Sequence, residues 1–200
     1  MQDFQALTVK YNGRTNVLFS EVGVSKPFDL QDTANHSPII NTRAIWDTGA
    51  SCTVITKELA AQIGLVPTGK TTITGVNHET EENTYLVNIY LPNKVCFMFV
   101  KIAEVPALTG GASLLIGMDI IGSGDFSVFT ENWNTVMSYR YPSVGGMDFV
   151  TEAGNVRAHK AVLEKLDHER KTRTISNKLK KKHKQERMNK NKGRKKKNKQ

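Results

Sequence analysis

The sequence has only two cysteines and no run of apolar residues long enough to span a bilayer. Residues 1–4 do not resemble the start of a secretory signal, which would have a basic region followed by an apolar stretch. Cys52 and Cys96 lie next to or within apolar segments, so we expect two buried thiols rather than a disulfide or a metal pair. These absences argue against a membrane protein or a disulfide scaffold and favour a cytoplasmic location.

Metal and phosphate sites are also missing as local patterns. The five histidines have no spacing typical of metal ligands. Residues 117–124 contain three glycines but lack the lysine of a phosphate-binding loop. We therefore expect no metal ion and no cofactor.

Positive charge is scarce over most of the chain and concentrated in its last part. Residues 1–156 contain nine Lys or Arg against fifteen Asp or Glu, whereas residues 157–200 contain nineteen against four. The final residues are a low-complexity mixture of Lys, Asn and Gln with almost nothing to bury. We predict a domain over residues 1–143, a linker over residues 144–156 and a basic tail over residues 157–200 that is partly helical or disordered.

The basic tail has two interpretations. Its charge could attach the protein to nucleic acid, a ribosome or another polyanion by counterion release, which gives weak, salt-sensitive and largely sequence-independent binding. It could equally be a solubilising extension. No aromatic residue follows Phe149, so base stacking is not expected to contribute. Four apolar residues favour a short amphipathic helix at the start of the tail: Val156, Val162, Leu163 and Leu166.

The part of the chain before the tail reads mainly as short β-strands. Apolar and polar residues alternate over several segments bounded by Gly, Pro, Asn or Asp. These segments are residues 6–10, 17–19, 85–90, 95–100 and 136–139. One helix is predicted between a Thr56 cap and a terminal Gly64. The pattern predicts an all-β domain with one or two short helices.

The most informative segment is a polar turn between two apolar runs. Its members are Asp47, Thr48, Gly49, Ala50 and Ser51. Asp and Gly are common in ordinary turns, but a polar turn between buried strands places its carboxylate inside the protein rather than at a loop tip. Asp47 could then perform acid–base chemistry, while Thr48 could hold the turn by hydrogen bonding and Gly49 allows close approach of a substrate or another backbone.

This turn resembles the active-site turn of the retropepsin-like aspartic proteases, the short single-lobe relatives of pepsin. A hairpin candidate follows at residues 71–78, where the family has its flap, and residues 114–119 are similar to the family's second apolar-apolar-glycine element. The resemblance covers about residues 15–140 and implies a closed β-barrel with a short helix near residues 118–121. It assigns substrate contacts in the flap to Ile73, Gly75, Val76 and Asn77, and packing beneath the turn to Leu115, Ile116 and Gly117.

An aspartic protease needs two carboxylates facing one water molecule, and the sequence offers one convincing turn. Asp32 is the nearest second candidate, but the residues after it lack the glycine, and we interpret them as a loop. We therefore predict a homodimeric aspartic endopeptidase in which Asp47 of each copy supplies one carboxylate. By resemblance, Thr48 would bond across the dimer and Gly49 would contact the peptide substrate.

Two questions stay open at this point. A protein with this fold could keep the turn without catalysis and serve as a peptide-binding module, tethered to nucleic acid or a ribosome by its tail. The acidic residues that follow the predicted flap, Glu79, Glu81 and Glu82, could favour basic peptides or could be solvated surface charges.

Overall fold

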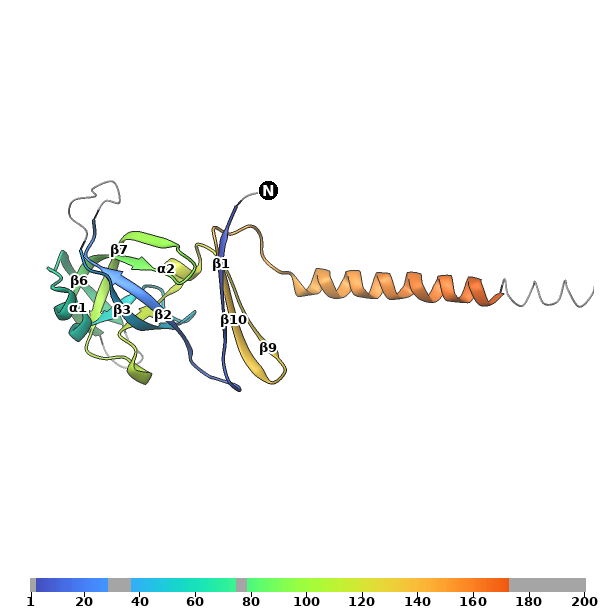
Figure 1. Cartoon of the computed structure of the whole chain (residues 1–200), viewed down its shortest axis with the longest axis horizontal. Helices are drawn as coiled ribbons and strands as arrows, with labels where there is room; N and C mark the ends of the chain where they lie inside the picture. Colours follow the sequence, from blue (N-terminus) through green and yellow to red (C-terminus); the bar gives the residue numbers. More distant parts are fainter. Residues whose placement is uncertain (1–2, 29–36, 75–78, 173–200) are drawn as a thin grey trace, which may run out of the picture. The chain divides into compact units, whose positions relative to one another are not determined.

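The computed structural model describes residues 3–28, 37–74 and 79–172 (Figure 1). The chain divides into two compact units, Met1–Gly146 and Met147–Gln200. All strands among the described residues belong to the first unit. Each unit is described by itself below.

Most strands of the first unit form one seven-stranded sheet, within the residues that the structure describes. These strands are β2 (Leu18–Ser25), β3 (Ile40–Trp46), β4 (Val54–Thr56), β5 (Gly69–Thr74), β6 (Glu79–Tyr90), β7 (Cys96–Val105) and β8 (Leu114–Ile116). Their order is β2-β3-β8-β4-β7-β6-β5, and β2 also pairs with β6. Because of this additional pairing, the strands β2-β3-β8-β4-β7-β6 form a closed ring in that order. Strand β5 pairs with β6 and lies outside the ring.

A second sheet has three strands in the order β1-β10-β9, and it stands beside the ring in Figure 1. Its strands are β1 (Gln5–Lys10), β9 (Asp125–Glu131) and β10 (Asn134–Tyr141). Trp46, at the end of β3, joins this sheet to the ring: its indole stacks on Phe126 with ring centroids 5.7 Å apart and lies 5.1 Å from the ring of Tyr139. Strand β3 of the ring is therefore packed directly against the second sheet.

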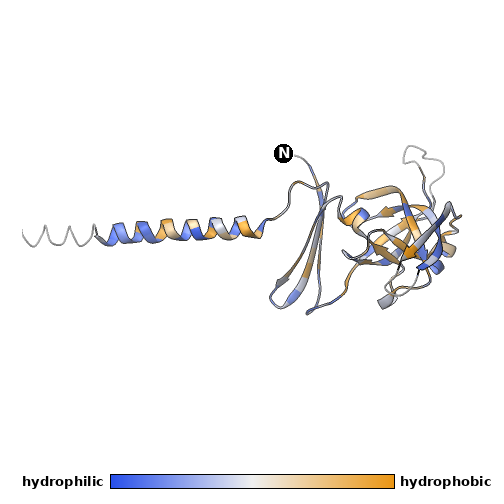
Figure 2. Cartoon of the chain, turned by 180° about the vertical axis from the view of Figure 1, so that it is seen from behind, coloured by the Kyte–Doolittle hydropathy of each residue, from blue (hydrophilic) through white to orange (hydrophobic). Residues whose placement is uncertain are grey.

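Apolar residues gather on the strands of the first unit, as the colours of Figure 2 show. Successive side chains of a strand point to opposite faces, so every second side chain points inward. Val87, Ile89, Leu114, Ile116 and Met137 have no exposed surface. Burial of each such side chain contributes about 1.5–3 kcal/mol to folding. The predicted all-β class with short helices is confirmed.

The helix expected after the active-site strand is α1 (Lys57–Ile63). The Thr56 hydroxyl accepts a hydrogen bond from the amide of Leu59, which satisfies one of the free N–H groups of the first turn. Gly64 ends the helix in the left-handed conformation, with φ 71°, and its amide bonds back to the last turn. Both predicted ends of this helix are confirmed.

Two short helical turns flank β8. η1 (Thr109–Gly111) precedes it, and α2 (Met118–Ile121) follows it. The bounds of α2 agree with the helix that the resemblance implied near residues 118–121. Its Ile120 and Ile121 are buried and join the core.

The turn between β9 and β10 is exposed. Asn132 and Trp133 both have positive φ, 49° and 67°, as a tight two-residue hairpin turn requires. Trp133 is 77% exposed and lies 5.3 Å from the guanidinium carbon of Arg14. The chain's two tryptophans thus occupy opposite environments, since Trp46 is buried.

The second unit contains a helix over residues 149–172, all of them exposed. Asp148 begins it: its carboxylate accepts hydrogen bonds from the Val150 amide at 2.9 Å and the Thr151 hydroxyl at 2.6 Å, and these bonds lower the pKa of Asp148. The helix thus starts within the predicted linker of residues 144–156. No helix among the described residues has the length and apolar character needed to cross a membrane.

Candidate active site

Asp47 is the first residue after β3, and the neighbouring strand β8 fixes its position. β3 and β8 run parallel, with Trp46 opposite Ile116. The Asp47 amide then donates a hydrogen bond to the Ile116 carbonyl at 3.0 Å. The carboxylate is therefore carried at the end of a buried strand, as the sequence predicted.

The turn is held by the carboxylate itself. Asp47 Oδ1 accepts a hydrogen bond of 2.8 Å from the amide of Gly49, and the Asp47 carbonyl accepts one of 3.3 Å from Ala50. Thr48, Gly49 and Ser51 are exposed, and the Thr48 hydroxyl has no hydrogen bond to any described residue of the chain. Within one copy of the chain, Asp47 rather than Thr48 thus locks the turn.

The predicted second element, Leu115, Ile116 and Gly117, lies directly against this turn. A Cβ on Gly117 would come within 2.5 Å of the carbonyl carbon of Cys52, so only glycine fits there without displacing the backbone. The next amide, of Met118, donates to the Ala50 carbonyl at 2.8 Å. Residues 65 to 68 positions apart are thereby joined into one support for the carboxylate.

A second link beneath the turn was not predicted from the sequence. The fully buried Thr53 hydroxyl donates to Asp119 Oδ1 at 2.7 Å and accepts from the Gly117 amide at 3.1 Å. Asp119 Oδ2 accepts in addition from the Thr53 amide at 2.9 Å. Thr53 and Asp119 carry no local signal of this pairing, because the contact depends on how β4 and α2 pack.

A pocket of about 500 Å³ opens beside Asp47. Most of its wall is apolar, and five separate parts of the chain supply it: the start of β2, the end of β3, the segment before β8, β8 itself, and β9. The lining residues include Leu18, Ile45, Trp46, Leu108, Leu115, Phe126 and Val128. Sequence reasoning identified Asp47, Thr48 and Leu115 in this set but missed the others, which have no shared sequence pattern.

The predicted flap is described only in part. Ile73 lies in β5, opposite Thr80 of β6, and is not among the residues that line the pocket beside Asp47. Gly75, Val76 and Asn77 lie outside the described residues, and so does the loop candidate at residues 32–34. Of the acidic residues after the flap, Glu81 forms an exposed ion pair of 2.7 Å with Lys70 of β5.

The expectation of two buried thiols was wrong for Cys52, which is exposed. Its backbone, rather than its side chain, packs against Gly117. Cys96 is half-buried and free, and burial raises the pKa of its thiol. No group of three His, Cys, Asp or Glu side chains within the described ranges could hold a metal ion.

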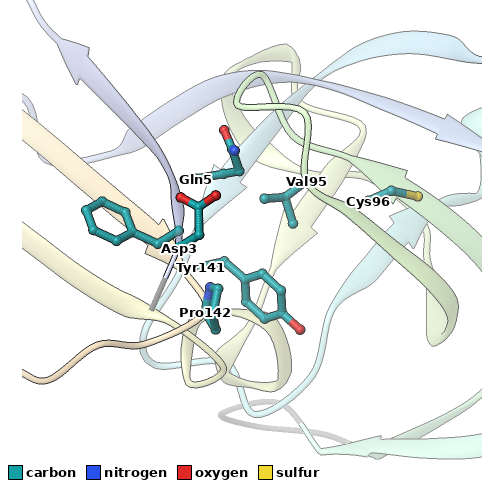
Figure 3. Close-up of a pocket in the computed structure, with 7 residues that line it drawn as sticks. Asp3, Gln5, Val95, Cys96, Tyr141 and Pro142 are labelled. Atoms are coloured by element: carbon teal, nitrogen blue, oxygen red, sulfur yellow. The ribbon is translucent and has the colours of Figure 1, made fainter. Parts of the chain in front are cut away.

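A smaller pocket of about 290 Å³ lies where β1 begins and β10 ends. Figure 3 shows Asp3, Val95 and Tyr141 around it, with the Cys96 sulfur directed away from Asp3. The Tyr141 ring also packs edge-on against Phe97, with centroids 5.0 Å apart. Asp3 is the only carboxylate among the described residues that line it, so they offer no pair of carboxylates.

Comparison with known proteins agrees with this site. Residues 34–120, which include the turn, β8 and all but the last residue of α2, match a family model described as aspartyl protease. No curated protein sequence matches the chain. The resemblance to the retropepsin-like aspartic proteases that was predicted from residues 47–51 and 114–119 is confirmed.

Among solved structures, the chain is similar to a retropepsin-like aspartic protease from Rickettsia conorii, with 17% identity and a TM-score of 0.42, over 70% of this chain and 98% of the other. It is similar to the EIAV protease complexed with the inhibitor HBY-793, with 20% identity and a TM-score of 0.40, over 57% and 92%. It is also similar to the retroviral protease-like domain of Ddi1 from Leishmania major, with 16% identity and a TM-score of 0.33, over 61% and 94%.

Proposed function

We propose that this protein is an aspartic endopeptidase that acts as a homodimer, with Asp47 of each copy as its catalytic carboxylate. The observation that carries the proposal is the position of Asp47. It lies at the end of a buried strand, on a turn supported from beneath by Gly117, and at the edge of a pocket of about 500 Å³. An acid–base group beside a concave, mostly apolar pocket is the arrangement expected of a catalytic site.

The need for a second copy follows from chemistry. Hydrolysis by two carboxylates and one water requires one of the carboxylates to be ionised and the other protonated. Of the residues that the structure describes, no acidic residue other than Asp47 lines the pocket. The exposed turn and the exposed apolar residues Val128 and Phe129 on the edge strand β9 support pairing with a second copy near the site.

The mechanism is a general acid–base attack of water. Two carboxylates about 3 Å apart cannot both ionise, so the pair shares one proton and titrates as a coupled unit. The ionised Asp47 takes a proton from the water as it attacks the peptide carbonyl, and the protonated partner donates to the carbonyl oxygen. No covalent intermediate forms.

Substrate binding would use both the pocket and the flap. The apolar wall formed by Leu18, Leu108 and Phe126 suits a large apolar side chain next to the cleaved bond. Gly49 would contact the substrate backbone and Thr48 would bond across the dimer. Ile73, Gly75, Val76 and Asn77 would form the flap that closes over the peptide and excludes water.

The test is cleavage of an unbiased peptide library between acidic and neutral pH by the native protein and by Asp47→Asn. The asparagine keeps an Oδ1 that can accept the Gly49 amide bond, so the turn should persist while the acid–base group is lost. We expect cleavage to fall by about 10²–10⁴-fold. Asp167→Asn, the same chemical change on the exposed helix, is the matched control and should cleave normally. Equal cleavage by the native protein and Asp47→Asn would contradict the proposal.

Sedimentation of the native protein tests the dimer separately. We expect a concentration-dependent monomer–dimer equilibrium, with activity rising more steeply than protein concentration near the dissociation constant. A protein that cleaves as a monomer would rule out the shared pair of Asp47 residues.

A second candidate function is a peptide-binding module attached to nucleic acid or a ribosome by residues 157–200, and the nineteen basic residues against four acidic ones favour this attachment. Binding to single-stranded RNA should weaken by orders of magnitude between 50 and 200 mM salt if several phosphates are contacted. Removal of residues 157–200 should abolish it. RNA binding without any Asp47-dependent cleavage would favour this second function. The cytoplasmic location and the predicted boundaries at residues 143 and 156 stay predictions.

A further inference from the structure

One wall of the pocket beside Asp47 is formed by a loop that has little regular structure of its own. Residues 106–113 connect β7 to β8 and contribute Leu108 and Thr109 to the pocket. Within the loop, η1 is a single turn, and Gly110 and Gly111 both have positive φ. The position of this wall must therefore depend on contacts with the rest of the domain.

Arg43 of β3 holds this loop at two points. Its carbonyl accepts a hydrogen bond of 3.0 Å from the Ser113 amide, and its guanidinium Nη1 donates one of 3.3 Å to the Gly110 carbonyl. Arg43 lies in β3, four residues before Asp47, which directly follows that strand. The strand that carries the carboxylate thus also anchors the opposite wall of its pocket.

Phe19 completes this arrangement. The guanidinium carbon of Arg43 lies 4.1 Å from the centre of the Phe19 ring, within the range of a cation–π contact. A Cβ on Gly110 would come within 2.6 Å of Phe19 Cζ, so the loop backbone approaches the same ring closely. The Phe19 carbonyl accepts a hydrogen bond of 2.7 Å from the Tyr11 hydroxyl, which fixes the strand beneath.

The Arg43 guanidinium is not engaged in an ion pair with any residue that the structure describes. The Arg43 side chain is exposed, so water can solvate its charge without the contacts to Phe19 and Gly110. Its contacts are the ring of Phe19, which lies in β2, and the carbonyl of Gly110, which lies within the loop. The planar fork of arginine can stack and donate simultaneously, which lysine does less well.

We propose that Arg43 is a positioning residue that clamps residues 106–113 against Phe19 and thereby sets the width of the pocket beside Asp47. The effect on substrates rests on the proposed peptidase function, whereas the clamp itself does not. Release of the clamp should let Leu108 and Thr109 move away from Asp47, so that the pocket accepts a wider range of side chains and holds each of them less well.

The test compares Arg43→Met and Arg43→Lys with Arg14→Met, which removes a similar guanidinium–aromatic contact at the Trp133 hairpin turn. The first readout is amide hydrogen exchange of residues 110–113 in the full-length protein. We expect about five- to fiftyfold faster exchange in Arg43→Met, a smaller increase in Arg43→Lys, and no change in Arg14→Met. Unchanged exchange in Arg43→Met would overturn the clamp.

The second readout is peptide-library cleavage with separate kcat and KM values. We expect Arg43→Met to raise KM several-fold more than it lowers kcat and to broaden the preference at the position that faces the pocket, with Arg43→Lys between it and the native protein. A loosened loop with unchanged KM and preference would overturn the role in the pocket. If the native protein cleaves nothing, the peptidase proposal fails, and the exchange measurement alone still supports or overturns the clamp.

Discussion

The turn at Asp47 and the helix over residues 149–172 are both local segments that begin with an aspartate whose side chain accepts backbone amide bonds. Their surroundings differ completely. The turn at Asp47 is supported by Gly117 and the end of β8, which are distant in sequence, and by nearby Thr53, whose hydroxyl accepts from the Gly117 amide. Every residue of the helix over residues 149–172 is exposed, and the bonds at its Asp148 cap are local. In the turn at Asp47, tertiary packing thus supports the capping interaction. In the helix, the same kind of interaction depends on local helix propensity.

This difference predicts how each region responds to substitution. A change in the turn must be accommodated by neighbours that are close-packed and cannot move independently. A change in the helix affects only helix propensity and capping, each of which contributes about 1 kcal/mol or less per residue. Function that requires a carboxylate in one fixed place belongs in the first kind of region.

Glycine-to-alanine substitution in each region gives the largest contrast. Gly117→Ala places a Cβ 2.5 Å from the Cys52 carbonyl carbon and should destabilise the first unit by about 2–3 kcal/mol, with loss of cleavage. Gly154→Ala meets no atom within 4 Å and should increase helicity, since alanine favours a helix over glycine by about 1 kcal/mol. Denaturant unfolding measures the first and far-ultraviolet circular dichroism the second. Equal effects in both positions would contradict the contrast.

The buried hydroxyl beneath the turn should give the next largest effect. Thr53→Val keeps the shape of the side chain but leaves the Gly117 amide without its acceptor and removes one bond to Asp119. We expect a loss of about 1–3 kcal/mol in the free energy of unfolding. Thr53→Ser keeps the hydroxyl and should retain more of the stability than valine does. A valine variant as stable as the native protein would show that the link beneath the turn is dispensable.

The pH dependence of stability gives a further test of the first unit, through Asp125 at the start of β9. Bonds from Ser143, the Val144 amide and Arg140 lower its pKa from 3.8 to about 2. Because its pKa is lowered on folding, the ionised Asp125 stabilises the folded state at pH values above the ordinary carboxyl pKa of 3.8. This contribution is lost as the pH falls through the folded-state pKa of about 2. The native protein should therefore exceed Asp125→Asn in stability at pH 6, and the difference should narrow toward pH 2.

Denaturant unfolding at several pH values checks this expectation. Glu131→Gln is a suitable control, because Glu131 forms an exposed ion pair with Lys10 that should contribute less than about 1 kcal/mol. If the native protein and Asp125→Asn differed by the same free energy of unfolding from pH 6 to pH 2, the bonds to Ser143 and Val144 would not depend on the charge of Asp125.

The smallest effect is expected at the helix cap. Asp148→Ala removes the acceptor of the Val150 and Thr151 bonds and should reduce helicity near residue 149, whereas Asp148→Asn can still cap the helix. Circular dichroism of the full-length chain measures the difference. The unfolding of the first unit should not change in either variant, and a shared loss of stability would show that the two regions are energetically coupled.

Sequence reasoning located the parts of the site that depend on local chemistry. The Asp47 turn and the ends of α1 at Thr56 and Gly64 were predictable, because caps, glycines and apolar runs act over a few residues. The helix α2 was expected only from the family resemblance. Gly117 was assigned to a packing role beneath the turn, and its lack of space for a Cβ gives the physical reason.

The rest of the site depends on contacts between distant segments. Leu108 and Phe126 line the pocket because loops and strands meet in the folded domain, and neither has a local pattern that sets it apart from other apolar residues. The Thr53–Asp119 bonds and the Arg43 contact with Phe19 are likewise products of strand register. Cys52 was misjudged for the same reason, since its apolar neighbours in sequence are not its neighbours in space.

The contrast between the two tryptophans makes the protein a spectroscopic reporter of its own site. Trp46 is 3% exposed, lines the pocket beside Asp47 and donates its indole N–H to Ser20, whereas Trp133 is 77% exposed on a hairpin turn. Their fluorescence should separate into a blue-shifted component shielded from iodide and a red-shifted component quenched by it. With Trp133→Phe, the remaining emission would follow the filling of the pocket beside Asp47 directly, without a label and without turnover.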